Sequence, residues 1–194
     1  MTFETLLKLN LGSGGRPREG YVNVDLHSGK ADKKADCGRP LPFPDGSVSE
    51  IRAVHVLEHL SVGRDDVADR EQFYVDVLKD WHRVLTPGGL LVAVIPDVVL
   101  WAHLYLYGHA EYSQLASALY GHDNTPALAH GYGFSGWHVA VLMRRAGFLN
   151  PRQINKNDWA RATRELSTEQ LRQHWGIAGG QPVSGHVEVR GVKQ

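Results

Sequence analysis

Short apolar runs alternate with amphipathic stretches through the first half of the chain. The runs lie at residues 8–11, 21–25, 51–56 and 89–96, and we expect each to form a strand. The run 89–96 is apolar throughout, which is typical of a strand buried on both faces. Before it, apolar residues recur at three- and four-residue spacing and predict a helix stopped by Pro87-Gly88-Gly89. The residues of that helical pattern are Phe73, Val77, Leu78, Trp81 and Leu85.

The C-terminal third adds one helix and two strands. The pattern of Trp137, Val141, Leu142 and Ala146 predicts a helix ended by Gly147, and a strand is expected over 148–155. Residues 185–192 alternate in polarity and predict an antiparallel edge strand. The charge-rich stretch 158–175 is expected to be partly helical.

Strands that alternate with helices indicate a parallel sheet with crossover helices, and such sheets bind ligands at the carboxyl ends of their strands. The first such end is the turn Leu11-Gly12-Ser13-Gly14-Gly15. The chain from Gly14 to Asp25 is too short for a full crossover helix, and it includes Pro17 and Gly20. We therefore expect one side of the sheet to be bare or covered by another element.

Composition and charge narrow the class of protein. The chain of 194 residues suits one domain, and its 21 acidic and 21 basic residues give a formal net charge of zero. Such a balance gives no overall attraction to nucleic-acid backbones or acidic membranes. The single cysteine, Cys37, forms no internal disulfide, and neither a signal peptide nor an apolar run of transmembrane length is evident. We expect a cytoplasmic protein.

Four segments of the chain, taken in order, resemble the motifs of one known family. The glycine turn resembles its motif I, residues 36–47 its "LPFPDxSF" segment, residues 54–59 its "xxVLEH" segment, and residues 81–89 its "RVLKPGG" turn. This family is the methyltransferase-11-like group of the class I S-adenosylmethionine-dependent methyltransferases. Residues 137–148 resemble their "W…L…AGF" helix. The glycine turn with Gly20, Asn23 and Asp25 is closest to the "LGSGxxxxxGWxNxD" subgroup of predicted methyltransferases.

The resemblance implies an α/β, Rossmann-like class I methyltransferase sheet, mostly parallel with an antiparallel last strand. It also implies a truncated first crossover helix and a helical insertion after the fifth strand. Residues 1–194 then form a single methyltransferase domain, with 97–136 as a substrate-side helical insertion. A homodimer or a partner protein could cover the face that lacks the first helix.

The resemblance also implies S-adenosyl-L-methionine as the cofactor. Asp25 would accept hydrogen bonds from the ribose hydroxyls, Asp36 would meet the adenine amino group, and His55 would lie beside the methionine moiety. Outside this register, Gly12 and Gly14 would form a plain strand-ending turn, and either aspartate could be an ordinary turn residue. The expected cofactor-binding residues are Leu11, Gly12, Ser13, Gly14, Asp25, Leu26, Asp36, Cys37, His55 and Val56.

The segment His55-x-x-Glu58-His59 raises the question of a metal site. It matches an inverted zinc-peptidase signature, but that motif needs its ligands on one helix, whereas His55 ends a predicted strand. Some ubiquinone-pathway and small-RNA methyltransferases bind a divalent ion through an ExxEH segment here. This chain has His at the first Glu, and hard cations prefer oxygen ligands. We therefore expect Glu58 and His59 to cap the following helix and contact substrate or cofactor without metal.

Residues 97–138 are rich in aromatic and histidine side chains and contain no Lys or Arg. Such a surface suits a sugar, an aromatic ring or another small acceptor and makes a nucleic-acid partner unlikely. Trp101 and Tyr105, at helical spacing, are expected instead in the core. For His122, His130, Tyr132 and His138 the two alternatives stay open. The candidate general bases are, in order, His59, His130 and His138.

Three functions follow from these observations. The first is transfer of a methyl group to an O or N atom of a small-molecule or glycan-type acceptor. The second is a non-catalytic module that binds S-adenosylmethionine and acts with a partner protein. The third, a nicotinamide-dependent oxidoreductase, is disfavoured because the chain lacks a GxGxxG fingerprint and carries the "RVLTPGG" turn.

Overall fold

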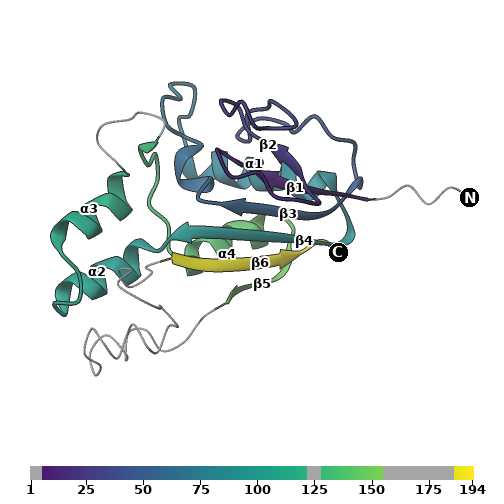
Figure 1. Cartoon of the computed structure of the whole chain (residues 1–194). Helices are drawn as coiled ribbons and strands as arrows, with labels where there is room; N and C mark the ends of the chain where they lie inside the picture. The colour runs from purple at the N-terminus through teal and green to yellow at the C-terminus, as the bar shows by residue number, and fades with distance from the viewer. Residues whose placement is uncertain (1–5, 122–127, 155–185) are drawn as a thin grey trace, which may run out of the picture.

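A computed structural model describes residues 6–121, 128–154 and 186–194. It contains one six-stranded sheet with the strand order β2-β1-β3-β4-β6-β5 (Figure 1). The strands are β1 (Leu7–Leu11), β2 (Val22–Val24), β3 (Val48–Val54), β4 (Leu85–Pro96), β5 (Leu149–Ile154) and β6 (His186–Val192). Strands β2, β1, β3 and β4 are parallel, whereas β6 runs antiparallel to both of its neighbours. The predicted Rossmann-like, mostly parallel α/β sheet is confirmed.

The predicted position of the last strand is wrong in one respect. Residues 186–192 form β6, but β6 lies between β4 and β5, so the edge strand is β5. The alternation that predicted β6 reports which side chains are buried, with Val187 and Val189 in the core. Alternation does not show whether a strand has neighbours on one side or on both sides, so it could not place β6 between β4 and β5.

Two helices cover one face of the sheet. Helix α1 (Arg70–Val84) and helix α4 (Gly136–Arg145) contact each other there, behind the strands in Figure 1. Helix α1 is capped by the Asp69 carboxylate, which accepts a hydrogen bond from the Gln72 N–H, and it buries Tyr74 and Trp81 completely. The helix ends at Val84, before the predicted stop, because Leu85 is already extended and begins β4.

The predicted lack of a first crossover helix is confirmed. Residues 12–21 join β1 to β2 without a helix, and among the described residues α1 and α4 pack on the same face. The opposite face of the sheet carries charged side chains, including the ion pairs Lys8–Glu50 and Arg190–Glu188. The charged side chains make this face of the sheet polar. That a partner protein or a second copy of the chain covers it stays a prediction.

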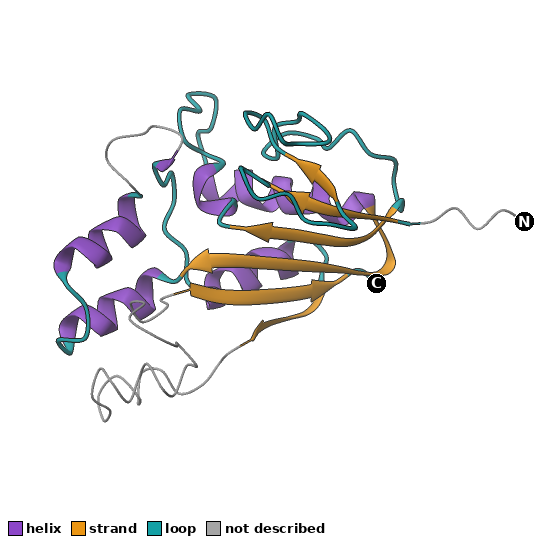
Figure 2. Cartoon of the chain, in the orientation of Figure 1, coloured by secondary structure: helices purple, strands orange, loops and turns teal. Residues whose placement is uncertain are grey.

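The helical insertion projects from the carboxyl ends of the parallel strands (Figure 2). It comprises α2 (Val98–Leu106) and α3 (Tyr112–Tyr120), which contact each other. It follows the fourth strand of this chain rather than the fifth, because residues 25–47 contain no strand, only a single bridge between Val24 and Lys33. The predicted partial helix at 158–175 lies outside the described residues.

The interpretation of Tyr105 as core is wrong, because its side chain is 41% exposed. Trp137, which belongs to the helical pattern of α4, is 65% exposed, whereas its neighbours Val139 and Ala140 are buried. Trp101 is buried as expected. Among the described helices none is both long and apolar enough to cross a membrane.

Asp97 joins the two ends of the insertion, and we expect its loss to destabilise the fold. Its buried carboxylate accepts hydrogen bonds from the N–H groups of Val99 and Leu100 at 3.0 Å and of Gly136 at 2.9 Å. Asp97→Ala leaves these donors without partners and should lower the free energy of unfolding by about 2–4 kcal/mol in urea titrations. Asp69→Ala, which removes an exposed helix cap, should lower it by only about 1 kcal/mol. Equal losses in the two variants would contradict the role of Asp97.

Candidate functional site

One pocket lies where the carboxyl ends of three neighbouring parallel strands meet. It follows β1 at Gly12, β2 at Asp25 and β3 at His55, which is the point where the strand order reverses. We call it the strand-end pocket; its volume is about 480 Å³. Its lining is Gly12, Asp25, Leu26, His27, Ala35, Asp36, Cys37, His55, Val56, His59, Leu60, Val62, Arg64 and Leu128.

Gly12 brings the backbone of the glycine turn against Val56, the second residue after β3. Its φ is +60°, and a Cβ built on it would lie 2.4 Å from Cγ2 of Val56. An L side chain meets both a strained backbone and a steric clash at this position. The turn therefore needs glycine at this position, because the backbone of the turn lies close to Val56.

Asp25 holds the loop around the pocket through hydrogen bonds to the backbone. Oδ2 accepts the Gly14 N–H at 2.8 Å, and Oδ1 accepts those of His27 at 2.8 Å and Ser28 at 2.7 Å. Burial acts to raise the pKa of Asp25, but these backbone donors together lower it, so the carboxylate is ionised at neutral pH. A carboxylate has about four acceptor positions, which leaves room for about one further hydroxyl rather than the two predicted.

Asp36 is paired with an arginine that the sequence analysis missed. Nη2 of Arg64 lies 2.7 and 2.6 Å from its two oxygens, and the Gly38 N–H donates to Oδ1 at 2.8 Å. The Arg64 side chain is 12% exposed and its guanidinium lies 5.4 Å from the centre of the Phe73 ring. Arg64 lies in a loop outside every recognised motif, so nothing in the local sequence pointed to it.

The other predicted residues divide into two groups. Leu26, Cys37 and Val56 line the strand-end pocket. Burial raises the pKa of Cys37 to about 12, so its thiol is protonated and acts as wall rather than nucleophile. Leu11, Ser13 and Gly14 do not line it: Leu11 is in the core because it ends β1 under the helices, and Ser13 is buried behind the turn.

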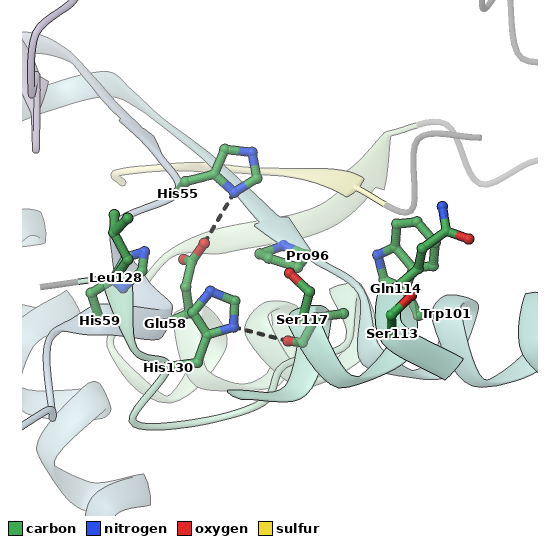
Figure 3. Close-up of a pocket in the computed structure, with 11 residues that line it drawn as sticks. His55, Glu58, His59, Pro96, Trp101, Ser113, Gln114, Ser117, Leu128 and His130 are labelled. Carbon is green, nitrogen blue, oxygen red and sulfur yellow. Dashed lines mark hydrogen bonds and ion pairs between the residues drawn. The ribbon is translucent and has the colours of Figure 1, made fainter. Parts of the chain in front are cut away.

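A second pocket of about 660 Å³ opens beside the first, under the helical insertion (Figure 3). We call it the histidine pocket; it is lined by His55, Glu58, His59, Pro96, Trp101, Ser113, Gln114, Ser117, Ala118, Leu128 and His130. The two pockets share His55, His59 and Leu128, so they meet at the end of β3. Trp101 thus combines burial in the core with a place in the pocket wall.

Two of the three predicted bases stand together in the histidine pocket. Nδ1 of His59 lies 2.8 Å from the carbonyl oxygen of Ala129, and Nδ1 of His130 lies 2.9 Å from that of Ala118. A carbonyl only accepts, so each Nδ1 carries the proton and the lone pair of each neutral ring is on Nε2. Burial lowers the pKa of His130, which keeps its ring neutral at pH 7.

No protein-family model matches the chain, and no curated protein matches its sequence. Solved structures match it across nearly its whole length. A SAM-dependent methyltransferase from Thermotoga maritima, described as a possible histamine N-methyltransferase, has a TM-score of 0.56 at 21% identity, covering 97% of this chain and 82% of that one.

Two archaeal structures are similar in the same way. A SAM-dependent methyltransferase from Archaeoglobus fulgidus has a TM-score of 0.56 at 16% identity, with 98% and 88% coverage. A putative methyltransferase from Haloferax volcanii, in complex with the activator Trm112, has a TM-score of 0.52 at 17% identity; the match covers 97% of this chain and 83% of that one. The fold is the class I methyltransferase fold. At these identities the likeness establishes the arrangement of the chain, and the chemistry has to be argued from the pockets.

In this methyltransferase fold, His138 stands apart from both pockets, so the structure does not bring the third predicted base to the site. Its ring lies 5.6 Å from that of Tyr132 and 5.9 Å from that of Phe134, and Nε2 is 3.9 Å from a Glu71 oxygen. Tyr132 belongs to the same aromatic cluster, packed on Tyr74 of α1. His122 lies outside the described residues.

The turn after β3 carries strain at the junction of the two pockets. His55 has a φ of +54°, a left-handed conformation that non-glycine residues rarely adopt. Its Nδ1 lies 3.0 Å from Oε1 of Glu58. Glu58 and His59 fall in a 3₁₀ turn, Leu57–His59, rather than capping an α-helix, which aims both side chains into the histidine pocket.

Proposed function

We propose that this protein transfers a methyl group from S-adenosylmethionine to an O or N atom of a small-molecule or glycan-type acceptor. The observation that carries the proposal is the junction of the two pockets at His55, His59 and Leu128. One pocket sits where this fold binds ligands, at the strand ends beside the reversal of strand order, and the other opens directly onto it.

The strand-end pocket has the groups that S-adenosylmethionine requires. Its volume of about 480 Å³ falls in the range of small-ligand sites. The ionised Asp25 can accept a ribose hydroxyl, and the Gly12 backbone allows close approach. In this proposal Asp36, which pairs with Arg64, meets the adenine end of the cofactor, and His55 lies beside its methionine moiety; both residues line the pocket, which supports the proposal.

The histidine pocket suits an uncharged acceptor. Its wall offers the Trp101 ring and the polar side chains of Ser113, Gln114 and Ser117, and its lining contains no Lys or Arg. Aromatic surface with a few hydroxyl and amide groups is typical of sugar and aromatic-ring sites. The same lining offers nothing to neutralise a phosphate backbone, which makes a nucleic-acid acceptor a poor fit.

Methyl transfer needs orientation and, for an alcohol, removal of one proton. The acceptor lone pair attacks the methyl carbon in line with the C–S bond, that bond breaks, and S-adenosylhomocysteine leaves with the electron pair. The proton of an acceptor hydroxyl passes to Nε2 of His59 or His130, which carries the lone pair of a neutral ring. An amine acceptor needs no strong base, and the two rings then only position it.

Calorimetric titration of the purified chain with S-adenosylmethionine, with S-adenosylhomocysteine and with NAD tests the proposal. We expect saturable 1:1 binding of the first two ligands and none of NAD. Incubation with methyl-labelled S-adenosylmethionine across a panel of sugars, phenols and amines then identifies the acceptor class. Absence of S-adenosylmethionine binding by the folded protein would refute the main proposal.

A second candidate function is a binding module that acts with a partner protein. One similar structure is a complex of a putative methyltransferase with an activator, and none of the described helices packs on the sheet face opposite α1 and α4 in this chain. Binding of S-adenosylmethionine without turnover on any acceptor would favour this alternative.

Asp25 is the residue whose charge we expect to matter for cofactor affinity. Asp25→Ala removes the acceptor for three backbone N–H groups and for the ribose, so S-adenosylmethionine binding should weaken by about 100-fold or more. Asp32→Ala is the matched control, because Asp32 also accepts a backbone N–H, from Asn23 at 2.8 Å, but does not line the pocket. An unchanged dissociation constant in Asp25→Ala would contradict the assignment.

The same residue predicts a pH dependence. The pKa of Asp25 is lowered in the folded protein. The contribution of the Asp25 charge to cofactor affinity is therefore complete above the ordinary pKa of about 3.9, and it is lost only as pH falls through the lower pKa of the folded protein. The ratio of affinities between wild type and Asp25→Asn should therefore stay constant from about pH 8 to pH 5. A ratio that changes across this range would show that another group controls binding.

A further inference from the structure

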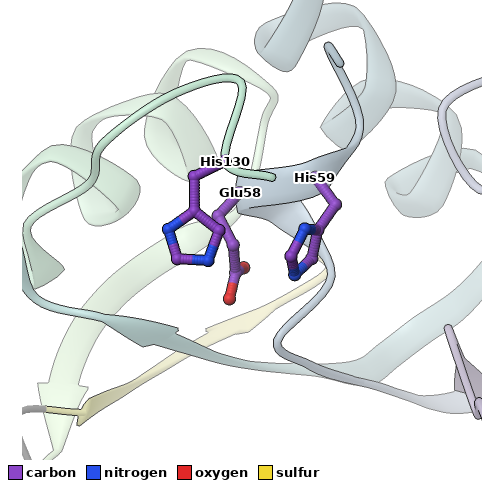
Figure 4. Close-up of side chains that lie close together, drawn as sticks. All are labelled: Glu58, His59 and His130. Atoms are coloured by element: carbon purple, nitrogen blue, oxygen red, sulfur yellow. The ribbon is translucent and has the colours of Figure 1, made fainter. Parts of the chain in front are cut away.

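Glu58, His59 and His130 bring their ligating atoms together in the histidine pocket. These atoms all lie within 4.8 Å of one another (Figure 4). We infer that the three side chains form a binding site for a divalent transition-metal ion. The inference concerns ion binding alone and does not depend on methyl transfer.

The spacing is close to that of a coordination shell. Ligand atoms about 2.1 Å from an ion stand roughly 3–3.5 Å apart, so small side-chain rotations bring the three atoms into range. Figure 4 shows the Glu58 carboxylate between the two imidazole rings, whose centroids are 4.9 Å apart. An ion placed among them would contact all three residues.

Both imidazoles are oriented as metal ligands usually are. Each Nδ1 is held by a main-chain carbonyl, that of Ala129 for His59 and that of Ala118 for His130. A ligating histidine typically donates its other ring N–H to such an acceptor, which fixes the ring and leaves the second nitrogen for the ion. The two residues reach this arrangement independently, from different segments of the chain.

The buried Glu58 carboxylate is a second, independent indication that a cation binds here. Its side chain is only 2% exposed, and Oε2 has no hydrogen-bond partner among the described residues, while Oε1 meets His55. A buried carboxylate oxygen without a partner is costly unless a cation or donor meets it. Glu58 lines the histidine pocket, where an ion would reach it.

The loop that carries His130 is fixed to the turn that carries Glu58. The Gly131 N–H donates to the Glu58 carbonyl at 2.7 Å, and Nη1 of Arg70 bridges the Gly131 carbonyl and the Ser61 hydroxyl at 3.1 and 2.8 Å. This anchoring sets the distance between ligands before any ion binds, which favours affinity.

The donor set selects the class of ion. Two imidazole nitrogens and one carboxylate suit Zn²⁺, Co²⁺, Fe²⁺ or Mn²⁺, whereas Mg²⁺ and Ca²⁺ prefer oxygen ligands. The remaining positions of the ion would face the histidine pocket and could take an acceptor oxygen. With the ion bound, the Nε2 lone pairs of both rings would be on the ion; coordination would lower the pKa of the acceptor hydroxyl, and its proton would pass to solvent. The sequence alone predicts no metal site, because His130 is far along the chain from Glu58 and His59 and only folding brings it to them.

The test uses the full chain, without a polyhistidine tag, stripped of metal with a chelator. Titration with Co²⁺, followed by its visible absorption and by calorimetry, should give one site per chain. Glu58→Gln and His130→Ala should each weaken Co²⁺ binding by at least about tenfold. His138→Ala is the matched control, because this histidine lies outside both pockets and should leave the dissociation constant unchanged. Far-ultraviolet circular dichroism checks that each variant is folded. If His130→Ala does not fold, His130→Gln is used in its place.

Three results would overturn the inference. The first is a wild-type protein that binds no Co²⁺ at millimolar concentration. The second is binding that survives in both Glu58→Gln and His130→Ala, or that His138→Ala weakens equally. The third is Mg²⁺ binding as tight as Co²⁺ binding, which would contradict the nitrogen-rich donor set. None of these results bears on S-adenosylmethionine binding, so the two proposals can fail separately.

Discussion

Gly12→Ala is expected to abolish measurable S-adenosylmethionine binding. The new Cβ would lie 2.4 Å from Cγ2 of Val56, and the residue would have to hold a φ of +60°. The left-handed backbone alone costs about 1–2 kcal/mol, and relief of the clash moves either the glycine turn or the start of the 3₁₀ turn. We expect affinity to fall by about 100-fold or more in calorimetric titration, since tenfold corresponds to about 1.4 kcal/mol.

Gly15→Ala is the control for this prediction. It lies in the same turn, its φ is not in the left-handed region, and a Cβ there meets no atom within 4 Å. Its affinity should match that of wild type within about threefold, a difference of less than 1 kcal/mol. If both variants bind equally well, the turn does not touch the cofactor and the proposed pocket is wrong.

Trp81→Ala is expected to give the largest loss of stability. The indole is completely buried in α1, and its Nε1 donates to the Cys37 carbonyl at 3.1 Å, which ties the helix to the wall of the strand-end pocket. Removal of a fully buried tryptophan costs about 3–5 kcal/mol through lost contacts and the cavity left behind. Urea unfolding followed by circular dichroism measures the change.

Trp81→Phe separates the two contributions. Phenylalanine fills most of the space but has no donor, so the Cys37 carbonyl loses its partner at a cost of about 1–2 kcal/mol. A Trp81→Ala variant that loses less than about 1 kcal/mol would contradict the packing described for α1. We also expect both variants to bind S-adenosylmethionine more weakly, because Cys37 lines the pocket.

Because the first crossover is truncated, a single carboxylate organises the loop at the strand-end pocket. Residues 12–21 form no helix, so no helix N-terminus faces the pocket from this segment. Asp25 instead gathers the N–H groups of Gly14, His27 and Ser28 around itself. This arrangement explains why we assign the two largest losses of affinity to Gly12 and Asp25.

Features set by neighbouring residues were predictable from the sequence. These features depend on local spacing, on apolar periodicity and on the length of chain available. They are the strands at 8–11 and 89–96, helices α1 and α4, the glycine turn and the missing crossover helix. Asp25 could be placed because it follows β2 directly, and in a parallel sheet consecutive strand ends meet at one edge.

Features that join distant segments were decided only by the tertiary structure. Arg64 meets Asp36, His130 stands beside Glu58, and His138 turns away into an aromatic cluster. The position of β6 between β4 and β5 also depends on contacts between distant segments. Periodicity reports which face of an element is buried, but pairing across the molecule depends on how those faces pack together. The sequence therefore determined the parallel strands and the glycine turn, whereas packing decided where β6 pairs and which histidines reach the site.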